Sequence, residues 1–378
     1  MSLAIRPIRV DEVAVLQDFL RAHWNENHAF VRSRELLLWQ HSTNPFKAGS
    51  AYADDELTFL GSWDGEDLIA VLGEIPLDFT IRGRVQRGTW LALWKNRAEK
   101  EHGSAGLQLF HRITSGSAVF VGGIGINERV RLAYRLFRFQ LFEDLPLYLV
   151  LNPEVESAMV RKKQSFSEET GARYFAHTPA PGISPGYRIE SGPAAASEWD
   201  VFWSQARNDI VGTDRSSSYM RWRYLLHPHY RYDWVRVYDD RDALIAAGVY
   251  RIEEAMGERV MHVVEFLGDT KASTQLAKAL CGVMRAQSAS FLAFRCARAR
   301  SFAPWLEVGG ACYEFGDPAY EVPSLFQPVV PEYHPLVWGY RVASDIDRET
   351  LEDCYVTRSD GDQDRPNLIA SGSLERPG

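Results

Sequence analysis

The stretch Thr89-Trp-Leu-Ala-Leu-Trp94 begins a pattern of strands and helices that decides the fold of this chain. It starts a unit of strand, loop, helix, strand and helix end, over residues 89–94, 103–106, 107–113, 118–122 and 133–139. The same order returns later, over residues 259–266, 274–285, 290–294 and 305–310. Leu107 corresponds to Gln275, an offset of 168, and Tyr134 corresponds to Trp305, an offset of 171. An internal repeat of this kind predicts two related domains.

The segments around each copy complete a plan of mixed α and β structure, read from apolar spacing. The first half has predicted strands over 4–9, 57–63, 68–79, 85–94, 118–122 and 141–151, and helices over 10–25, 33–40, 107–113 and 133–139. The second half has predicted helices over 195–207, 217–226 and 274–285, and strands over 232–238, 243–251, 259–268 and 290–294. Ser33 is the expected N-cap of the second helix, and Asp64-Gly65 is the expected hairpin turn.

The run Thr178-Pro-Ala-Pro-Gly-Ile-Ser-Pro-Gly186 marks the domain boundary, because proline and glycine interrupt helical and strand periodicity. We expect an N-terminal domain over 1–152, a linker over 153–186, a C-terminal domain over 187–345 and a solvated polar tail over 346–378. The tail includes Asp360-Gly-Asp-Gln-Asp364, whose acids are spaced as in a calcium loop. Arg365 stands where such loops need glycine, so no metal site is predicted.

Composition limits the function classes. The chain has 378 residues, of which 46% are hydrophobic and 24% charged, as in soluble globular proteins. No apolar run is long enough for a membrane span, and the N-terminus lacks a signal-peptide core. The net charge of −8 argues against nucleic acid as the main partner. The four cysteines are scattered without a CxxC pair, which favours buried thiols in a cytoplasmic protein.

The order of elements, with a glycine-bearing loop before the helix that follows a central strand, resembles the GNAT fold of acyl-CoA-dependent N-acyltransferases. Over roughly residues 4–343 the chain resembles tandem GNAT proteins of bacterial surface-polysaccharide pathways. The resemblance implies an α/β (α+β) fold of two GNAT-like domains, each with a mixed, mostly antiparallel central sheet flanked by helices. It also implies acyl transfer from acetyl-CoA or another acyl-CoA to an amino group of a sugar or sugar nucleotide.

In GNAT proteins, a loop of the form Arg/Gln-x-x-Gly-x-Gly/Ala cradles the coenzyme A pyrophosphate. The corresponding run here is Glu101-His-Gly-Ser-Ala-Gly106, with Glu101 in place of Arg or Gln. Small residues at a helix N-terminus still offer N–H groups to a phosphate. The resemblance therefore implies that the coenzyme contacts Gly103, Ser104, Ala105 and Gly106, together with Leu91, Leu93 and Lys95 on the central strand. The second loop, Leu267–Thr274, has a single glycine and is assigned to the acceptor side.

The helix end Ala133-Tyr-Arg-Leu-Phe-Arg-Phe139 corresponds to the family's Leu-Tyr-x-x-Leu-Gly-Phe, with Arg138 in place of glycine. The resemblance gives Tyr134 the role of the acid that protonates the departing thiolate, a step that a phenol can perform. The alternative for Tyr134 is a packed core tyrosine.

The central strand Leu91–Lys95 carries no carboxylate, so a base must come from elsewhere. Acyl transfer to an amine needs such a base to remove the amine proton. We expect Glu74, on the preceding strand, to be this base, with His102 and Asp78 as lesser candidates. An exposed strand carboxylate is the alternative for both acids.

The run Arg215–Pro228 is rich in arginine and aromatic residues. A helix would place Tyr219, Trp222 and Arg223 along one edge. Arginine beside aromatic residues suits a phosphorylated or sugar-nucleotide acceptor, and tandem GNAT-like proteins of polysaccharide clusters have a similar segment. The alternative is an amphipathic helix whose arginines pair with acids of the domain.

Two other functions remain open. One is aminoacyl-tRNA-dependent transfer to a cell-wall precursor, which predicts a coiled-coil arm or a basic groove, neither evident in the sequence. The other is a non-catalytic GNAT-like module that binds a glycan or a protein. Binding of a coenzyme A thioester distinguishes the acyltransferase from the module.

Overall fold

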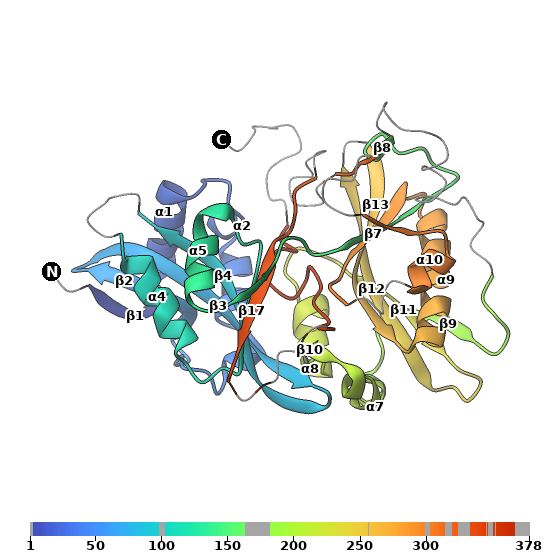
Figure 1. The fold of residues 1–378 in the computed structure, drawn as a ribbon, viewed down its shortest axis with the longest axis horizontal. Helices are drawn as coiled ribbons and strands as arrows, with labels where there is room; N and C mark the ends of the chain where they lie inside the picture. The colour runs from blue at the N-terminus through green and yellow to red at the C-terminus, as the bar shows by residue number, and fades with distance from the viewer. Residues whose placement is uncertain are drawn as a thin grey trace.

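The computed structural model describes residues 3–97, 103–162, 182–255, 257–298, 303–313, 320–323, 333–344, 346, 351 and 353–366. These residues form two sheets that lie beside each other, each with helices against it (Figure 1). The expected mixed, mostly antiparallel sheets are confirmed. No helix in the described part of the chain is both long enough and apolar enough to cross a membrane.

The first sheet has the strand order β1-β2-β3-β4-β5-β17-β6, and β10 pairs with the end of β3. Its strands are β1 (Ala4–Arg9), β2 (Glu56–Asp64), β3 (Asp67–Ile81), β4 (Arg84–Asn96), β5 (Phe120–Ile124), β6 (Gln140–Phe142), β10 (Val211–Thr213) and β17 (Trp338–Val342). Its helices are α1 (Val13–His23), α2 (Ala29–Arg32), α3 (Arg34–His41), α4 (Ala105–Thr114) and α5 (Glu128–Leu136). The first three cover the face that includes Trp90, and α4 and α5 cover the face that includes Leu91.

The second sheet has the strand order β15-β7-β14-β13-β12-β11-β9. Its strands are β7 (Leu147–Leu151), β9 (Arg188–Ser191), β11 (Asp233–Tyr238), β12 (Leu244–Ala255), β13 (Glu258–Gly268), β14 (Phe291–Arg295) and β15 (Ala311–Tyr313). Its helices are α7 (Ala196–Ala206), α8 (Ser217–Met220) with a π-helical turn over Arg221–Leu225, α9 (Thr270–Ala286) and α10 (Ala303–Glu307). A small separate sheet pairs β8 (Arg161–Lys162) with β16 (Tyr320–Glu321).

Local capping explains where several helices begin. The Ser33 hydroxyl accepts a hydrogen bond from the N–H of Leu36 at 3.0 Å, as predicted for the N-cap of α3. Asp269 caps α9 in the same way, through the N–H of Ala272 at 2.9 Å. These bonds satisfy N–H groups that a helix leaves without partners.

The internal repeat is confirmed in the topology. In each sheet one parallel pair, β4–β5 or β13–β14, lies among antiparallel neighbours. Each unit also ends in the same helix-terminal turn, with Arg138 at φ 63° in the first and Gly309 at φ 83° in the second. The N–H groups of Phe139 and Gly310 close these turns onto Tyr134 and Trp305. The substituted arginine therefore keeps the left-handed turn that glycine usually forms.

The two halves exchange strands. Residues 141–151, predicted as one strand that closes the first domain, form two strands, β6 and β7. β7 pairs with β14 and β15 in the second sheet, whereas β17 enters the first sheet between β5 and β6 (Figure 1). Pro146, which lacks an N–H group, precedes β7 and separates it from β6. Strand pairing therefore crosses the predicted domain boundaries in both directions.

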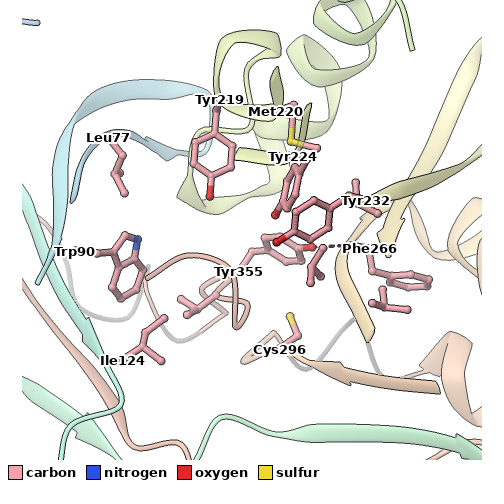
Figure 2. Packing of buried hydrophobic residues seen from close by; sticks show 14 of the residues in the cluster. Leu77, Trp90, Ile124, Tyr219, Met220, Tyr224, Tyr232, Phe266, Cys296 and Tyr355 are labelled. Carbon is pink, nitrogen blue, oxygen red and sulfur yellow. Dashed lines mark hydrogen bonds between the residues drawn. The ribbon is translucent and has the colours of Figure 1, made fainter. Parts of the chain in front are cut away.

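The expected solvated tail is wrong for residues 353–366, which pass through the interior between the halves. Tyr355, Thr357 and Ser359 are each at most 1% exposed. Asp360 and Asp364, interpreted as tail acids, are buried against Arg215 and Arg251 at 2.8 and 2.9 Å. Figure 2 shows Tyr355 between Trp90 of the first half and Phe266 of the second. Partners far away in the sequence therefore bury a segment that is polar by composition.

Candidate active site

Strands β4 and β5 diverge in the first sheet. Their parallel pairing runs from Gly88 with Phe120 to Leu91 with Gly123, and β4 then continues to Asn96 without β5. Within the described residues, nothing hydrogen-bonds to the edge of β4 that faces β5 beyond Leu91. Backbone N–H and C=O groups are strong hydrogen-bonding groups that rarely stay without partners when buried. This edge is therefore able to pair with an extended ligand.

A β-bulge shapes this edge. The register between β3 and β4 shifts so that Leu72 pairs with Trp94 and Gly73 pairs with Ala92, which leaves Leu93 as the extra residue. Leu93 has a φ of 52°, which is strained for a side chain that branches at Cγ and is buried here. Bulges and such strained residues concentrate at functional sites. The predicted coenzyme-contacting residues Leu91 and Leu93 thus bracket the point of divergence.

Tyr134 lies above this point. Its ring packs against Phe110 of α4 at 4.9 Å between centroids, and its Oη lies 2.9 Å from the position that a Cβ on Gly123 would take. Burial, followed by the charge of Asp362, raises the pKa of the Tyr134 phenol, so it stays protonated. A protonated phenol is thus held beside the end of the β4–β5 pairing.

Glu74 lies on the same row of the sheet, since it pairs with Leu91, which pairs in turn with Gly123. In-register neighbours project from the same face, so the Glu74 side chain projects beside that of Leu91. The Tyr134 hydroxyl lies over Gly123, on the other side of Leu91. The Oε1 of Glu74 accepts a hydrogen bond from the hydroxyl of Tyr52. Burial raises the pKa of this carboxyl, which favours proton uptake closer to neutral pH. The structure therefore brings two predicted catalytic residues, Tyr134 and Glu74, to one place.

The lesser base candidates do not join this row. Asp78 pairs with Arg87 across β3 and β4, and their side chains form an ion pair at 3.0 Å, towards the opposite end of β4 from the bulge. His102 lies outside the described residues, as does Glu101.

Helix α4 begins next to β4. It starts at Ala105, with Ser104 and Gly103 exposed in front of it. A Cβ on Gly106 would lie 2.2 Å from Oδ1 of Asn96, so glycine is needed for this approach. Asn96 Oδ1 is itself buried without a hydrogen-bond partner in the described part of the chain. The predicted small-residue loop thus brings the helix N-terminus to the diverging end of β4.

Lys95, the last residue of the predicted coenzyme set, lies on this end of β4. Its Nζ is 5.9 Å from the centre of the Trp24 ring, within the range of a cation–π contact.

The predicted acceptor residues Tyr219, Trp222 and Arg223 are buried between the halves, and Arg221 is exposed, as the helical edge predicts. Arg223 donates to the carbonyl of Gly361 at 3.1 Å, and Trp222 donates to the carbonyl of Trp39 at 3.2 Å. The Tyr219 hydroxyl is buried and has no partner in the described residues. Arg223 and Trp222 thus bond to protein groups, whereas Tyr219 keeps an unused hydroxyl.

The second sheet has the same divergence, but the chain fills it. Pairing of β13 with β14 ends at Val263 with Phe294, while β13 continues to Gly268. Beyond that point the N–H of Phe266 donates to the Tyr355 hydroxyl at 2.9 Å (Figure 2), and the Ser359 hydroxyl donates to the carbonyl of Val264 at 3.4 Å. The two divergences therefore differ: the first keeps an open strand edge, and residues 353–366 occupy the second.

The second half has a cavity of about 310 Å³ where α9 begins. It is lined by apolar residues such as Phe202 and Phe266 and by polar residues that include Asp269 and Arg298. Arg298 already donates to the carbonyl of Asp209 at 2.7 Å. The cavity is lined by part of the loop that the sequence assigns to the acceptor side.

Residues 353–366 contribute to both divergences, and sequence reasoning missed them. One signal was present: Cys354-Tyr-Val356 is an apolar run inside an otherwise polar segment. A second was the set of arginines at 215, 223 and 251, which need acids if they are buried.

Comparisons with known proteins identify the fold. No protein-family model matches the chain, and no curated protein matches its sequence. A GCN5-related N-acetyltransferase from Anabaena variabilis superposes with a TM-score of 0.55 at 10% identity, over 90% of this chain and 72% of that one. A probable N-acyltransferase of unknown function from Enterococcus faecalis V583 gives 0.54 at 11% identity over the same shares. A GCN5-related N-acetyltransferase from Kribbella flavida gives 0.51 at 12% identity, over 90% and 71%. The chain therefore has the GNAT fold predicted from its sequence.

Proposed function

We propose that the protein is an acyl-CoA-dependent N-acyltransferase whose coenzyme site is the β4–β5 divergence of the first half. The observation that carries this proposal is the open edge of β4 beyond Leu91, with the Tyr134 phenol held over its end. The likeness to N-acetyltransferases of the same fold supports it. The filled second divergence supports a coenzyme site in the first half alone.

The residues present fit the coenzyme. The bulge at Leu93 and the unpaired backbone beyond Leu91 are suited to amide groups of an extended chain. The N-terminus of α4, with Gly103, Ser104, Ala105 and Gly106, is suited to a pyrophosphate. When bound, the coenzyme supplies an acyl group as a reactive thioester. Lys95 lies on the same strand and adds a positive charge near that end.

The catalytic roles follow from position and protonation. Tyr134 holds its proton at Oη, because burial raises its pKa, and donates it to a developing negative charge at the divergence. Glu74, across Leu91, takes a proton from the acceptor amine, and its raised pKa makes it a stronger proton acceptor than an ordinary carboxylate. Tyr134 is buried and Glu74 is half-buried, and the reduced access of water strengthens electrostatic interactions between charges at the site.

We infer an amine of a sugar or sugar nucleotide as acceptor, from the resemblance of the Tyr219–Tyr224 segment to polysaccharide-pathway proteins. Trp222 and Arg223 bond to protein groups, so Tyr219 is the member of that set left to contact the acceptor. A cytoplasmic location is consistent with acyl-CoA as donor. An aminoacyl-tRNA donor and a non-catalytic binding module are the competing functions.

Calorimetric titration with acetyl-CoA and with free coenzyme A tests the proposal. We expect micromolar binding by the wild type and its loss in Gly106→Glu, whose side chain would meet Asn96 and Trp94. Leu107→Glu, at an exposed neighbouring position, is the matched control and keeps binding. Tyr134→Phe binds acetyl-CoA but transfers the acyl group roughly 10²–10⁴ times more slowly. A wild type that binds no coenzyme A thioester excludes the acyltransferase and favours the binding module.

A further inference from the structure

Residues 353–366 bring three acids into the interior at two-residue spacing: Asp360, Asp362 and Asp364, each at most 4% exposed. Asp360 accepts a hydrogen bond from Arg215 at 2.8 Å, and Asp364 accepts one from Arg251 at 2.9 Å. Both arginines are buried, so each of these two carboxylates has a buried cation beside it, which it shares with Glu265 or Glu253. They stabilise the passage of the segment between the halves.

Asp362 has a different environment. Its Oδ1 accepts a hydrogen bond from the side-chain amide of Gln363 at 2.6 Å, and its Oδ2 forms a longer ion pair with Nη1 of Arg365 at 3.6 Å. The Arg365 side chain is 27% exposed, and its Nη1 lies 2.7 Å from Nε2 of His28. A buried carboxylate without a close buried cation is costly for stability.

The carboxylate of Asp362 lies at the first divergence. The same amide of Gln363 donates to the carbonyl of Ile124, the last residue of β5, at 3.1 Å. The N–H of the following Gly125 donates to Val337, which immediately precedes β17. In a trans peptide the C=O and N–H point in opposite directions, so the Ile124 carbonyl points towards β4. The Gln363 amide, and with it the Asp362 carboxylate, therefore lies on the side where β4 and β5 separate.

Tyr134 lies at the same end of β5. Its Oη is beside Gly123, one residue before Ile124. Gly361, one residue before Asp362, lies against the Ile124 side chain. A Cβ added to Gly361 would be 3.6 Å from the Cβ of Ile124. The charge of Asp362 also contributes to the raised pKa of Tyr134, after burial. A phenol and a carboxylate therefore flank the end of β5 from different segments of the chain.

We propose that Asp362 binds the acceptor through its ammonium group, so that the acceptor of this site is a primary amine that carries a positive charge at neutral pH. This inference rests on the proposed acyltransferase function. An ammonium ion supplies a closer charge partner than Arg365, which pairs with the carboxylate at 3.6 Å, and it places the amine nitrogen at the end of the divergence. Asp362 is thus a specificity-determining residue supplied by the C-terminal segment, whereas Glu74 and Tyr134 supply proton transfer.

The test uses the full chain with acetyl-CoA and a panel of primary amines that includes glucosamine, spermidine and glycine ethyl ester. Coenzyme A release is followed as free thiol. For the amine that reacts best, Asp362→Asn is expected to raise KM about 10- to 100-fold, since a hydrogen bond to a charged group is lost. The dissociation constant of acetyl-CoA and kcat change less than about threefold, and Asp362→Glu recovers part of the KM.

Asp353→Asn is the matched control, because this acid of the same segment is 32% exposed in its side chain and pairs with Arg298. An unchanged KM in Asp362→Asn overturns the inference, and so does a combined loss of acetyl-CoA binding and thermal stability, which indicates a structural role. A wild type that binds acetyl-CoA but acylates no amine refutes the inference while the coenzyme site stands. A wild type that does not bind acetyl-CoA refutes both.

Discussion

Trp39 of α3 in the first half and Trp222 of the π-helical turn in the second half stack on each other and exchange hydrogen bonds. Their rings stack with centroids 5.0 Å apart at 22°, and each indole N–H donates to the backbone carbonyl of the other residue at 3.2 Å. Trp222 was predicted to contact an acceptor, and this reciprocal pair gives it a structural task. Arg223 adds to the pair with its guanidinium 5.5 Å from the centre of the Trp39 ring.

Breaking this pair is expected to destabilise the whole chain. Trp222→Phe loses a hydrogen bond, worth about 1 kcal/mol, and Trp222→Ala loses about 3–5 kcal/mol of packing. Trp39→Phe and the double variant complete a double-mutant cycle, in which we expect a coupling energy of about 0.5–3 kcal/mol. Unfolding in urea measures each value. Additive effects would show that the two rings do not act as a pair.

The left-handed turn at Arg138 offers a stabilising substitution. Arg138 adopts a φ of 63°, whereas the equivalent position of the second copy is Gly309. Because glycine adopts this conformation without a Cβ penalty, Arg138→Gly should raise the free energy of unfolding by about 0.5–1 kcal/mol. Arg135→Gly, inside α5, is the opposite control and should lower it by a similar amount. Thermal melting of the three proteins ranks them, and a destabilised Arg138→Gly variant would contradict the expectation.

Buried histidines should make the protein sensitive to mild acid. Burial lowers the pKa of His41 to about 3 and, as the largest cause, that of His227 to about 3. An unfolded histidine titrates near 6.5, so the unfolded chain binds more protons below that pH. The stability that neutral histidine contributes is complete above about pH 6.5, falls with decreasing pH, and is fully lost only below the folded pKa.

The slope of stability against pH measures this effect. Each such histidine adds up to about 1.4 kcal/mol per pH unit below pH 6. Urea unfolding between pH 7.5 and 5 gives the slope, and His227→Gln should reduce it. His111→Gln, at an exposed position, should leave it unchanged. Equal slopes in all three proteins would mean that the histidines do not control acid stability.

The filled second divergence predicts the binding stoichiometry. Tyr355 and Ser359 already satisfy the backbone of Phe266 and Val264, so a second coenzyme has no free strand edge. Trp305 also stands where the first copy has Tyr134, so the corresponding position carries no phenol. We expect one acetyl-CoA per chain by calorimetry. Two equivalent sites would show that residues 353–366 leave the second divergence.

Much of the fold was predictable because its signals are local. The apolar run within β4, the cap at Ser33 and the pattern of each repeat copy, which aligns Tyr134 with Trp305, all depend on neighbours within one or two elements. The same patterns brought Glu74 and Tyr134 into one hypothesis, and the strand register places Glu74 on the row of Gly123, beside which the Tyr134 hydroxyl lies.

The remaining features depend on partners that are distant in the sequence. Asp360 is 145 residues from Arg215, so composition alone assigns it to solvent. The exchange of β7 and β17 leaves no local mark either, because a short apolar strand fits any open sheet edge. Sequence periodicity identifies strands but does not say which sheet receives them.

The exchanged strand β17 sets a condition on the order of folding during synthesis. The first sheet has its own strands through β6, which ends at Phe142, yet its place between β5 and β6 is filled only by Trp338–Val342. Ribosomes add roughly 5–20 residues per second, so the intervening 195 residues (142 to 338) take roughly 10–40 seconds. Throughout that interval β5, one of the two strands that form the candidate active site, lacks its neighbour β17. The nascent N-terminal half must therefore wait for the end of the chain before it can hold a substrate.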